Sequence, residues 1–403
     1  TTTNRLKSRL RIFFSAMLIT TALPFIPYIF PFIPGQIFGF NFTGWAWMIM
    51  LLVTFLNLTR TRKIDFPVWF WLPWLMYLTV YLIIDFSFLG LQLTLQYSLP
   101  VLIGVVASGF AYSENDLQWI FKWFIRLCIA VMAMFVFGYL FRSGYTPASA
   151  AVPMIFSVAF SIFVALYFIS REKRYLLYAG ILFLAPVIDV TRMGILALAA
   201  IFIFHFANLS LKGKILFGGI GIIVFMMVFN SKSFQEKTFY SGQGSLSDLT
   251  INYYENTEIR SSGRISWKKA LEPGLKAEPV WGNGPRADNA YLTKISRKRG
   301  GEAHNDYLSV RFNYGYVGLA LLLFGFASSF ISLFKLSKKH RESHYIWLIS
   351  TSTLTLYISF LMFMFTDNIL KYTIYFPNYF FAMIGIVYSL KRNEDICSDT
   401  SLQ

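Results

Sequence analysis

Charged residues are scarce in this sequence of 403 residues: they make up 14%, whereas 56% of the residues are hydrophobic and 19% are aromatic. A soluble domain is about one quarter charged. A soluble fold of this length would also have far more water-facing surface than these polar residues can cover. The scarcity of charge therefore excludes an ordinary soluble protein.

Cysteine is scarcer still, with Cys128 inside an apolar stretch and Cys397 near the end of the chain. Two cysteines placed in this way provide neither a disulfide framework nor the spacing of a metal-binding motif. Among the 20 acidic residues, none forms an Asp-x-Asp motif or another acidic cluster in the longest polar segment. The sequence therefore predicts no metal site and no cofactor.

What the sequence does have is long apolar blocks. Each holds roughly 17–24 residues with almost no charge, the length that a helix needs to cross ~30 Å of hydrocarbon. The blocks do not alternate as the ~10-residue strands of a membrane barrel do. We therefore predict an all-α integral membrane protein with about twelve transmembrane helices, at residues 12–32, 41–58, 67–84, 91–110, 117–139, 149–170, 175–189, 193–209, 214–230, 313–334, 345–365 and 372–390.

Lysine and arginine lie unevenly between these helices. With the N-terminus in the cytoplasm, the inner segments carry 18 of them and the short outer segments carry 3, which are Arg142, Arg192 and Lys371. This bias predicts an even number of spans and two cytoplasmic termini, although one inner connection is acidic, at Glu114 and Asp116. The basic, apolar start of the chain resembles a secretory signal, but we expect a first transmembrane helix because no small-residue cleavage site follows.

One long polar segment interrupts the apolar pattern and divides the chain into three parts. Residues 1–230 are expected to form a bundle of nine helices, residues 231–312 an outer loop, and residues 313–403 three more helices with a cytoplasmic tail. The loop carries 13 Lys or Arg against 9 Asp or Glu. A basic surface beside a membrane attracts anionic partners such as phosphorylated lipids, but a solvated loop with incidental charge would look the same.

Two short motifs in the loop suggest an anionic ligand. The segment from Ser261 to Trp267 opens a predicted helix, and Arg264 would lie in its first turn, where a cation opposes the helix dipole unless an anion shares the site. The second motif, Trp-Gly-Asn-Gly-Pro-Arg at residues 281–286, is a turn whose glycines allow the backbone to approach a ligand closely. Such a turn is by itself a weak signal.

The third motif contains a candidate general base. Glu-Ala-His-Asn-Asp-Tyr-Leu at residues 302–308 holds His304, the only histidine on the predicted outer side. A lone histidine at a membrane surface is usually structural, but here Asn305 and Asp306 lie beside it and would orient its ring. Arg311 follows one turn later.

Charges at the ends of spans cluster on the same outer face. Asp189 and Arg192 flank one outer turn, and Asp367 and Lys371 flank the last one. Ionisable residues at membrane depth mark function by default, although Asp189 and Arg192 would also suit a simple structural pair. A site at the outer boundary favours chemistry on a lipid-linked substrate. A flippase or permease would place its charges near the midplane, where only two residues favour it, Arg126 and His205.

Four features occur in a defined order: Thr191-Arg192 at the head of a helix, Gly263-Arg264 with Trp267, the turn at Trp281, and His304-Asn305 before Tyr307-Leu308. In this order and topology they resemble the O-antigen ligase and polymerase superfamily of bacterial polysaccharide assembly. The resemblance implies a GT-C-like membrane fold with its large loop between the ninth and tenth helices.

The resemblance also implies a metal-independent glycosyltransferase of the Gram-negative inner membrane, with its site facing the periplasm. Its donor would be a glycan on undecaprenyl diphosphate, and its acceptor lipid A–core or a growing glycan. Membrane lipids would be its other partners, and nucleic acid would not. The family's arginines correspond to Arg192 and Arg264 and its histidine to His304; the remaining substrate-binding candidates are Lys268, Arg286, Asn305, Asp306 and Arg311.

The chemistry agrees with these residue types. A diphosphate leaving group needs cations, and arginine binds phosphate through two parallel hydrogen bonds. A sugar hydroxyl is activated by a base that titrates near neutral pH, as histidine does. Ligases of the family often carry a second histidine where this sequence has Glu302, which favours a polymerase. The set of two arginines and a histidine fits either enzyme, and we expect the ligase by a small margin.

Overall fold

The computed structural model describes residues 2–30, 32–61, 63–141, 151–206, 209–245, 248, 264–296 and 302–401. These residues are almost entirely helical, and the β-structure among them is a two-residue hairpin. In this hairpin, β1 (Gln36–Ile37) pairs antiparallel with β2 (Phe40–Asn41). The prediction of an all-α membrane protein is confirmed at this level.

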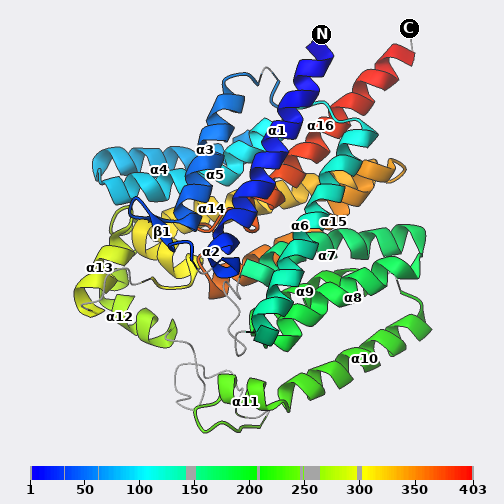
Figure 1. The fold of residues 1–403 in the computed structure, drawn as a ribbon. Helices are drawn as coiled ribbons and strands as arrows, with labels where there is room; N and C mark the ends of the chain where they lie inside the picture. Colours follow the sequence, from blue (N-terminus) through cyan, green and yellow to red (C-terminus); the bar gives the residue numbers. More distant parts are fainter. Residues whose placement is uncertain are drawn as a thin grey trace.

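The helices follow the predicted apolar blocks closely (Figure 1). Each predicted span falls on a helix, and the chain order is α1 (Thr2–Ala22), α2 (Ile26–Ile29), α3 (Phe42–Leu58), α4 (Leu72–Ile84), α5 (Phe88–Ser108), α6 (Glu114–Phe141), α7 (Ala151–Ser170), α8 (Lys173–Ile188), α9 (Arg192–Phe204), α10 (Leu211–Phe229), α11 (Lys232–Thr238), α12 (Arg264–Ala277), α13 (Ala287–Ser296), α14 (Asp306–Lys339), α15 (His344–Thr366) and α16 (Pro377–Ser401). Two single 3₁₀ turns, Leu23–Phe25 and Val68–Phe70, precede α2 and α4.

Six helices among the described residues are long and apolar enough to cross a membrane, namely α5, α6, α7, α10, α14 and α15. The helices α3, α4 and α9 are apolar but shorter than 18 residues. The count of twelve spans and the outer position of the loop therefore stay predictions, as do the three-part division and the topology. Both ends of the chain lie on the opposite side of the molecule from α12 and α13 (Figure 1).

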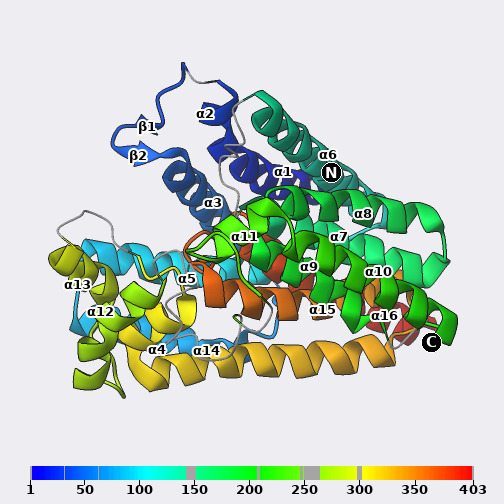
Figure 2. The same ribbon diagram turned by 90° about the horizontal axis from the view of Figure 1, so that it is seen from below.

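The centre of the bundle is built from α5, α15 and α16, which other helices surround (Figures 1 and 2). Gly104 of α5 and Gly385 of α16 lie so close that a Cβ on Gly385 would overlap the carbonyl of Gly104. Small residues allow membrane helices to approach in this way. The Ser359 hydroxyl of α15 donates a hydrogen bond to the Ala197 carbonyl of α9 at 3.0 Å and so joins α9 to this centre.

The longest helix, α14, is interrupted at Gly315, whose φ of +65° is not helical. The first part of α14, residues 306–314, contacts α12 and α13 and also contributes Val310 and Tyr314 to the main apolar core. The sequence predicted a span from residue 313, and the helix begins earlier, at Asp306.

The loop seals this interruption with its own backbone. The amides of Asn283 and Gly284 donate to the carbonyls of Phe312 and Asn313 at 2.9 and 3.0 Å. In return, the amides of Tyr316 and Val317 donate to the carbonyls of residues 279 and 280 at 3.0 and 3.2 Å. Backbone groups freed by a helix break must find partners within the protein at membrane depth, and residues 279–284 supply them.

The glycines of the Trp281–Arg286 turn serve this contact. Gly282 has a φ of +88°, and a Cβ at this position would overlap the backbone of Tyr314 and Gly315. Gly284 has a φ of +103°, and a Cβ there would overlap the Asp85 carboxylate. The glycines allow the close backbone approach that we expected, but the partner is the chain itself rather than a ligand.

The close contact between residues 279–284 and the break at Gly315 predicts that Gly315→Ala lowers the stability of the protein. Its Cβ would overlap the Val280 carbonyl, and the positive φ is strained for alanine. Such strain alone costs about 1–3 kcal/mol, so we expect a loss of about 3 kcal/mol or more, measured as a lower Tm in detergent. The control is Gly180→Ala in α8, where a Cβ meets nothing within 4 Å and helix propensity favours alanine. Equal melting of the two variants would contradict the seal.

Candidate active site

The candidate general base, His304, lies where the loop enters α14. Asn305 is the N-cap of the helix, and its side chain accepts a hydrogen bond from the amide of Leu308 at 2.9 Å. His304 itself has a φ of +45°, which is uncommon for a residue with a Cβ. Its side chain is 48% exposed. The chain therefore holds the imidazole at the surface of the protein, directly before a rigid helix.

The closest acidic partner of His304 comes from far along the sequence. Nδ1 of His304 is 3.7 Å from Oδ1 of Asp367, the residue that directly follows α15. The carboxylate is 17% exposed, so it is much better shielded than the ring. Asn305 and Asp306, the neighbours that the sequence suggested as orienting residues, are engaged elsewhere. Among the described residues, the carboxylate that pairs with the His304 ring is therefore that of Asp367.

Lys371 anchors the interior of the site. It lies in the turn between α15 and α16, and its side chain is only 3% exposed. The Nζ atom is 3.5 Å from Oδ2 of Asp288, at the start of α13, and 3.9 Å from Oε1 of Glu302. This ammonium group therefore links the turn between α15 and α16 to both ends of the loop segment between residues 286 and 306.

Glu302 contacts residues from separate parts of the chain. The Arg286 guanidinium donates to its Oε1 at 2.9 Å. The Asn368 amide and the Tyr372 hydroxyl donate to its Oε2 at 2.8 and 3.2 Å. Glu302 thus ties the Gly-rich turn, which ends at Arg286, to the turn that carries Asp367 and Lys371.

Asp288 is the buried counterpart of Glu302 and fixes α13 to α14. Its backbone amide donates to the Asn313 side chain at 2.8 Å, and that side chain donates back to Oδ1 of Asp288 at 3.0 Å. The hydroxyl of Ser309, one turn before Asn313, donates to Oδ2. The side chain of Asp288 is 1% exposed.

These contacts keep the cluster ionised. Burial alone would raise the pKa of Glu302, but the charges of Lys371 and Arg286 outweigh it and lower the pKa below the ordinary value. The pKa of Asp288 is lowered in the same way, against its burial, chiefly by Lys371. For Arg286, burial opposes the charged form, yet Glu302 and Asp288 raise its pKa. At neutral pH the interior of the site is therefore a set of compensated charges.

Asp306 lies under the same turn, fully buried. Its Oδ2 atom accepts a hydrogen bond from the amide of Leu370 at 3.0 Å, so the start of α14 is pinned to the turn between α15 and α16. Its Oδ1 atom has no hydrogen-bond partner among the described residues. Asp306 is too enclosed to contact a large substrate directly and positions the helix start instead.

Arg192 is the first residue of α9, directly after Thr191. The hydrogen bond between Ser359 and Ala197 sets the register of α9 against α15. The neighbouring Asp189 accepts from the Thr191 hydroxyl at 3.0 Å and pairs with Lys237 of α11 at 3.6 Å.

The remaining candidates are placed less closely. Arg264 begins α12, which confirms a helix at this motif; the preceding residues 261–263 lie outside the described residues. Lys268 is on the next turn of the same helix and is half-buried. The Arg311 guanidinium lies over the Tyr316 ring, 4.3 Å from its centre. The structure thus brings His304, Asn305, Asp306 and Arg286 into one cluster.

Sequence reasoning missed Asp288 as a site residue, and it treated Glu302 only as a departure from a family pattern. No local signal distinguishes Asp288 in its helix. Lys371 and Asp367 did carry a signal, as charges at the end of a span. Within the described residues, no group of three or more His, Cys, Asp or Glu side chains is arranged to hold a metal ion.

The fold and the site together define a multi-pass membrane protein with a compensated charge cluster at one end of its bundle. Residues 177–323 match the family model described as O-Antigen ligase. Over this segment the match supports the predicted resemblance to the O-antigen ligase and polymerase superfamily, a group of glycosyltransferase-like membrane enzymes. A search of curated proteins finds no match. The matched segment includes His304 and ends before Asp367.

The cluster predicts a strong effect of Lys371→Met. The change would leave Asp288 and Glu302 buried without their shared cation, and breaking a buried pair costs about 3–5 kcal/mol. We expect a large fall in Tm in detergent, partly restored by a second change, Asp288→Asn. The matched control is Lys276→Met, whose side chain is 74% exposed and pairs with Glu272 at 2.9 Å. A Lys371→Met protein that melts like the control would contradict the anchoring role.

Proposed function

We propose that this protein transfers a glycan from undecaprenyl diphosphate to a sugar hydroxyl on the periplasmic side of the bacterial inner membrane. The observation that carries the proposal is the exposed His304 ring beside the shielded Asp367 carboxylate, 3.7 Å away, within the superfamily segment. An exposed imidazole with a fixed acidic partner is suited to accept a proton from a hydroxyl.

In the proposed step, His304 removes the proton of the acceptor hydroxyl as its oxygen attacks the anomeric carbon of the donor glycan. The bond between this carbon and the diphosphate oxygen breaks, and its electron pair leaves with undecaprenyl diphosphate. Asp367 stabilises the imidazolium that forms. The proton then passes from His304 to the leaving group or to water, and no oxidant, metal or nucleotide enters the balance.

Arg192 and Arg264 are the proposed cations for the leaving diphosphate. Both begin a helix, α9 and α12 respectively. Helix N-termini favour anions because their first amides have no partner within the helix, so each arginine would add its charge to that of a helix start.

The other candidates divide into two groups. Lys268 and Arg311 are proposed to contact the donor or the acceptor. Arg286, Asn305 and Asp306 are engaged in an ion pair, a helix cap and a backbone hydrogen bond, which supports a positioning role for them rather than direct binding.

Within the superfamily we propose the ligase, which attaches O-antigen to lipid A–core. Glu302, at a place where ligases often carry histidine, favours a polymerase as the second candidate. Neither feature of a permease is supported: Arg126 is exposed and stacks on Trp123 at 4.5 Å, while His205 is buried against Phe168. The two residues do not share one path.

The proposal is tested by complementation of a bacterial strain that lacks the protein, scored by the glycan banding of its lipopolysaccharide. His304→Ala, Arg192→Ala and Arg264→Ala are expected not to rescue. Loss of the base alone lowers the rate by ~10²–10⁴-fold, and loss of either arginine removes a charge proposed to stabilise the leaving diphosphate. The controls are His340→Ala, at the other end of the bundle, and Lys294→Ala, exposed on α13. All variants must reach the membrane at equal levels.

The banding of the strain without the protein separates the two enzymes. Bare core, with long glycan kept on the carrier lipid, identifies a ligase. Core that carries a single repeat unit identifies a polymerase and overturns the ligase assignment. Full rescue by all three variants would overturn the site.

Asp367→Asn gives a finer test of the mechanism. The amide keeps the shape of the side chain but cannot stabilise the imidazolium. We expect transfer activity in purified membranes to fall roughly tenfold or more, within the ~10²–10⁴-fold range of base catalysis. The KM for the lipid-linked donor should stay unchanged. Glu236→Gln on α11, an exposed outer-loop carboxylate, is the control. An unchanged rate, or a loss confined to KM, would contradict the role of Asp367.

A further inference from the structure

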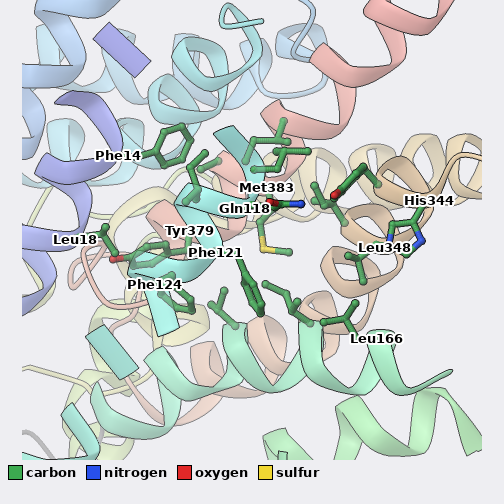
Figure 3. A pocket seen from close by; sticks show the side chains of 18 of the residues that line it. Phe14, Leu18, Gln118, Phe121, Phe124, Leu166, His344, Leu348, Tyr379 and Met383 are labelled. Carbon is green, nitrogen blue, oxygen red and sulfur yellow. The ribbon is translucent and has the colours of Figure 1, made fainter. Parts of the chain in front are cut away.

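A cavity of about 310 Å³ lies between α1, α6, α7, α15 and α16 (Figure 3). The site described above leaves this cavity unused. His344 lies at one end, and Leu18, Phe124 and Tyr379 lie at the opposite end (Figure 3). The positive-inside pattern predicts that this part of the molecule faces the cytoplasm.

The cavity has a polar rim and an apolar floor. Gln118 and His344 line the rim and are exposed. Phe124, Val158 and Met383 line the floor and are 4%, 2% and 7% exposed. The lining therefore changes from polar to apolar with depth, as a lipid changes from its headgroup to its chain.

The floor of the cavity is apolar, so a water molecule there would gain few hydrogen bonds. The Tyr379 hydroxyl, its clearest polar group, is hydrogen-bonded to Thr21 at 2.8 Å and to the Met17 carbonyl at 3.3 Å. Only the ring of Tyr379 faces Phe124, at 4.8 Å between centres. Apolar cavities of this kind exclude water and accept hydrocarbon.

The volume suits one hydrocarbon chain. A cavity of ~150 Å³ holds benzene, with six carbons. A cavity of about 310 Å³ therefore holds roughly twice that number of carbons, by the same comparison. This is enough for most of one acyl chain and too little for both chains of a phospholipid.

Two basic residues lie above the cavity on α1. Lys7, Arg11, Phe14 and Leu18 follow a spacing of four, three and four residues, which puts them on one face of the helix. Phe14 and Leu18 line the cavity. Arg11 therefore lies about one turn before Phe14 along α1, and Lys7 lies about two turns before it. Both basic side chains are exposed.

Arg11 also reaches the rim of the cavity. Its guanidinium lies 5.7 Å from the ring centre of Trp119, next to Gln118. The acidic group at this rim, Glu114, is already engaged, because it accepts hydrogen bonds from Tyr345 at 2.6 Å and Gln118 at 3.1 Å. A cationic pair above an apolar cavity is complementary to an anionic headgroup with an attached chain.

Lys7 and Arg11 border a second, more open groove along α1, which continues over Ile12 and Ile19. These two isoleucines are 59% and 62% exposed. The second chain of a phospholipid would lie along this groove while the first enters the cavity. We propose that the cavity between α1, α6, α7, α15 and α16 binds one acyl chain of an anionic phospholipid whose phosphate is held by Lys7 and Arg11.

The test uses the full-length protein, purified in detergent and stripped of lipid. Phosphatidylglycerol and phosphatidylcholine with identical chains are added separately, and Tm and the number of lipids retained in native mass spectrometry are measured. We expect one phosphatidylglycerol per chain and a Tm increase that phosphatidylcholine does not match. The proposal is independent of the glycosyltransferase function.

Two changes locate the lipid. The double variant Lys7→Gln with Arg11→Gln is expected to weaken phosphatidylglycerol binding about thirtyfold, because each basic residue near an anionic membrane surface contributes roughly a factor of five. Its control is Lys212→Gln with Lys214→Gln on α10. Ile162→Trp fills the cavity from α7 and should abolish retention, whereas Ile203→Trp on α9, 64% exposed, should not.

Three results would overturn the proposal: equal stabilisation by both lipids, unchanged binding by the Lys7 and Arg11 double variant, or full retention by Ile162→Trp. Because the charge variants alter only exposed side chains, they remain informative even if Ile162→Trp fails to fold.

Discussion

The backbone seal at Gly315 is the constraint on which the site depends. A helix that passes straight through would have no place for the loop, because its carbonyls would be used within the helix. The break frees the carbonyls of Phe312 and Asn313 and the amides of Tyr316 and Val317, and residues 279–284 satisfy all four. The hydroxyl of Tyr77 on α4 takes the next carbonyl, that of Tyr314, at 3.0 Å. Polar backbone at this depth has few other partners, so the loop is held in one position.

The position of the loop in turn places the residues of the charge cluster. The turn that seals the break ends at Arg286, and α13 starts directly after it, with Asp288 as its second residue. Asn313, on the N-terminal side of the break, holds Asp288, and Ser309 supports it one turn away. Lys371 then joins Asp288 and Glu302. A cluster of this kind adds little net stability compared with an apolar core, but it admits far fewer arrangements, and it leaves His304 in a defined place.

The sequence predicted the helices well because length and hydrophobicity decide whether a segment can lie in a membrane, and both are local properties. The motif at residues 302–308 and the charges at Arg192, Asp367 and Lys371 were visible for the same reason. The break at Gly315 was not predicted, since a glycine in an apolar helix is common and nothing local says that residues 279–284 will approach it. The pairing of Lys371 with Asp288 joins positions 83 residues apart, and no periodicity encodes such a contact. Nothing local showed that Asn305 would cap α14 or that Asp306 would accept from the Leu370 amide, so their role toward His304 stays a prediction.

The turn between α15 and α16 is synthesised after the other parts of the site. A ribosome completes the segment that contains His304 well before it reaches Asp367 and Lys371, and the segment matching the O-antigen ligase family already ends at residue 323. Until α15 and α16 are inserted, Asp288 and Glu302 have Arg286 but no ammonium group between them, and His304 has no carboxylate. A chain that ended before α15 would carry the recognisable motif without the charge cluster. Completion of the membrane bundle is therefore what assembles the cluster around Asp288 and Glu302.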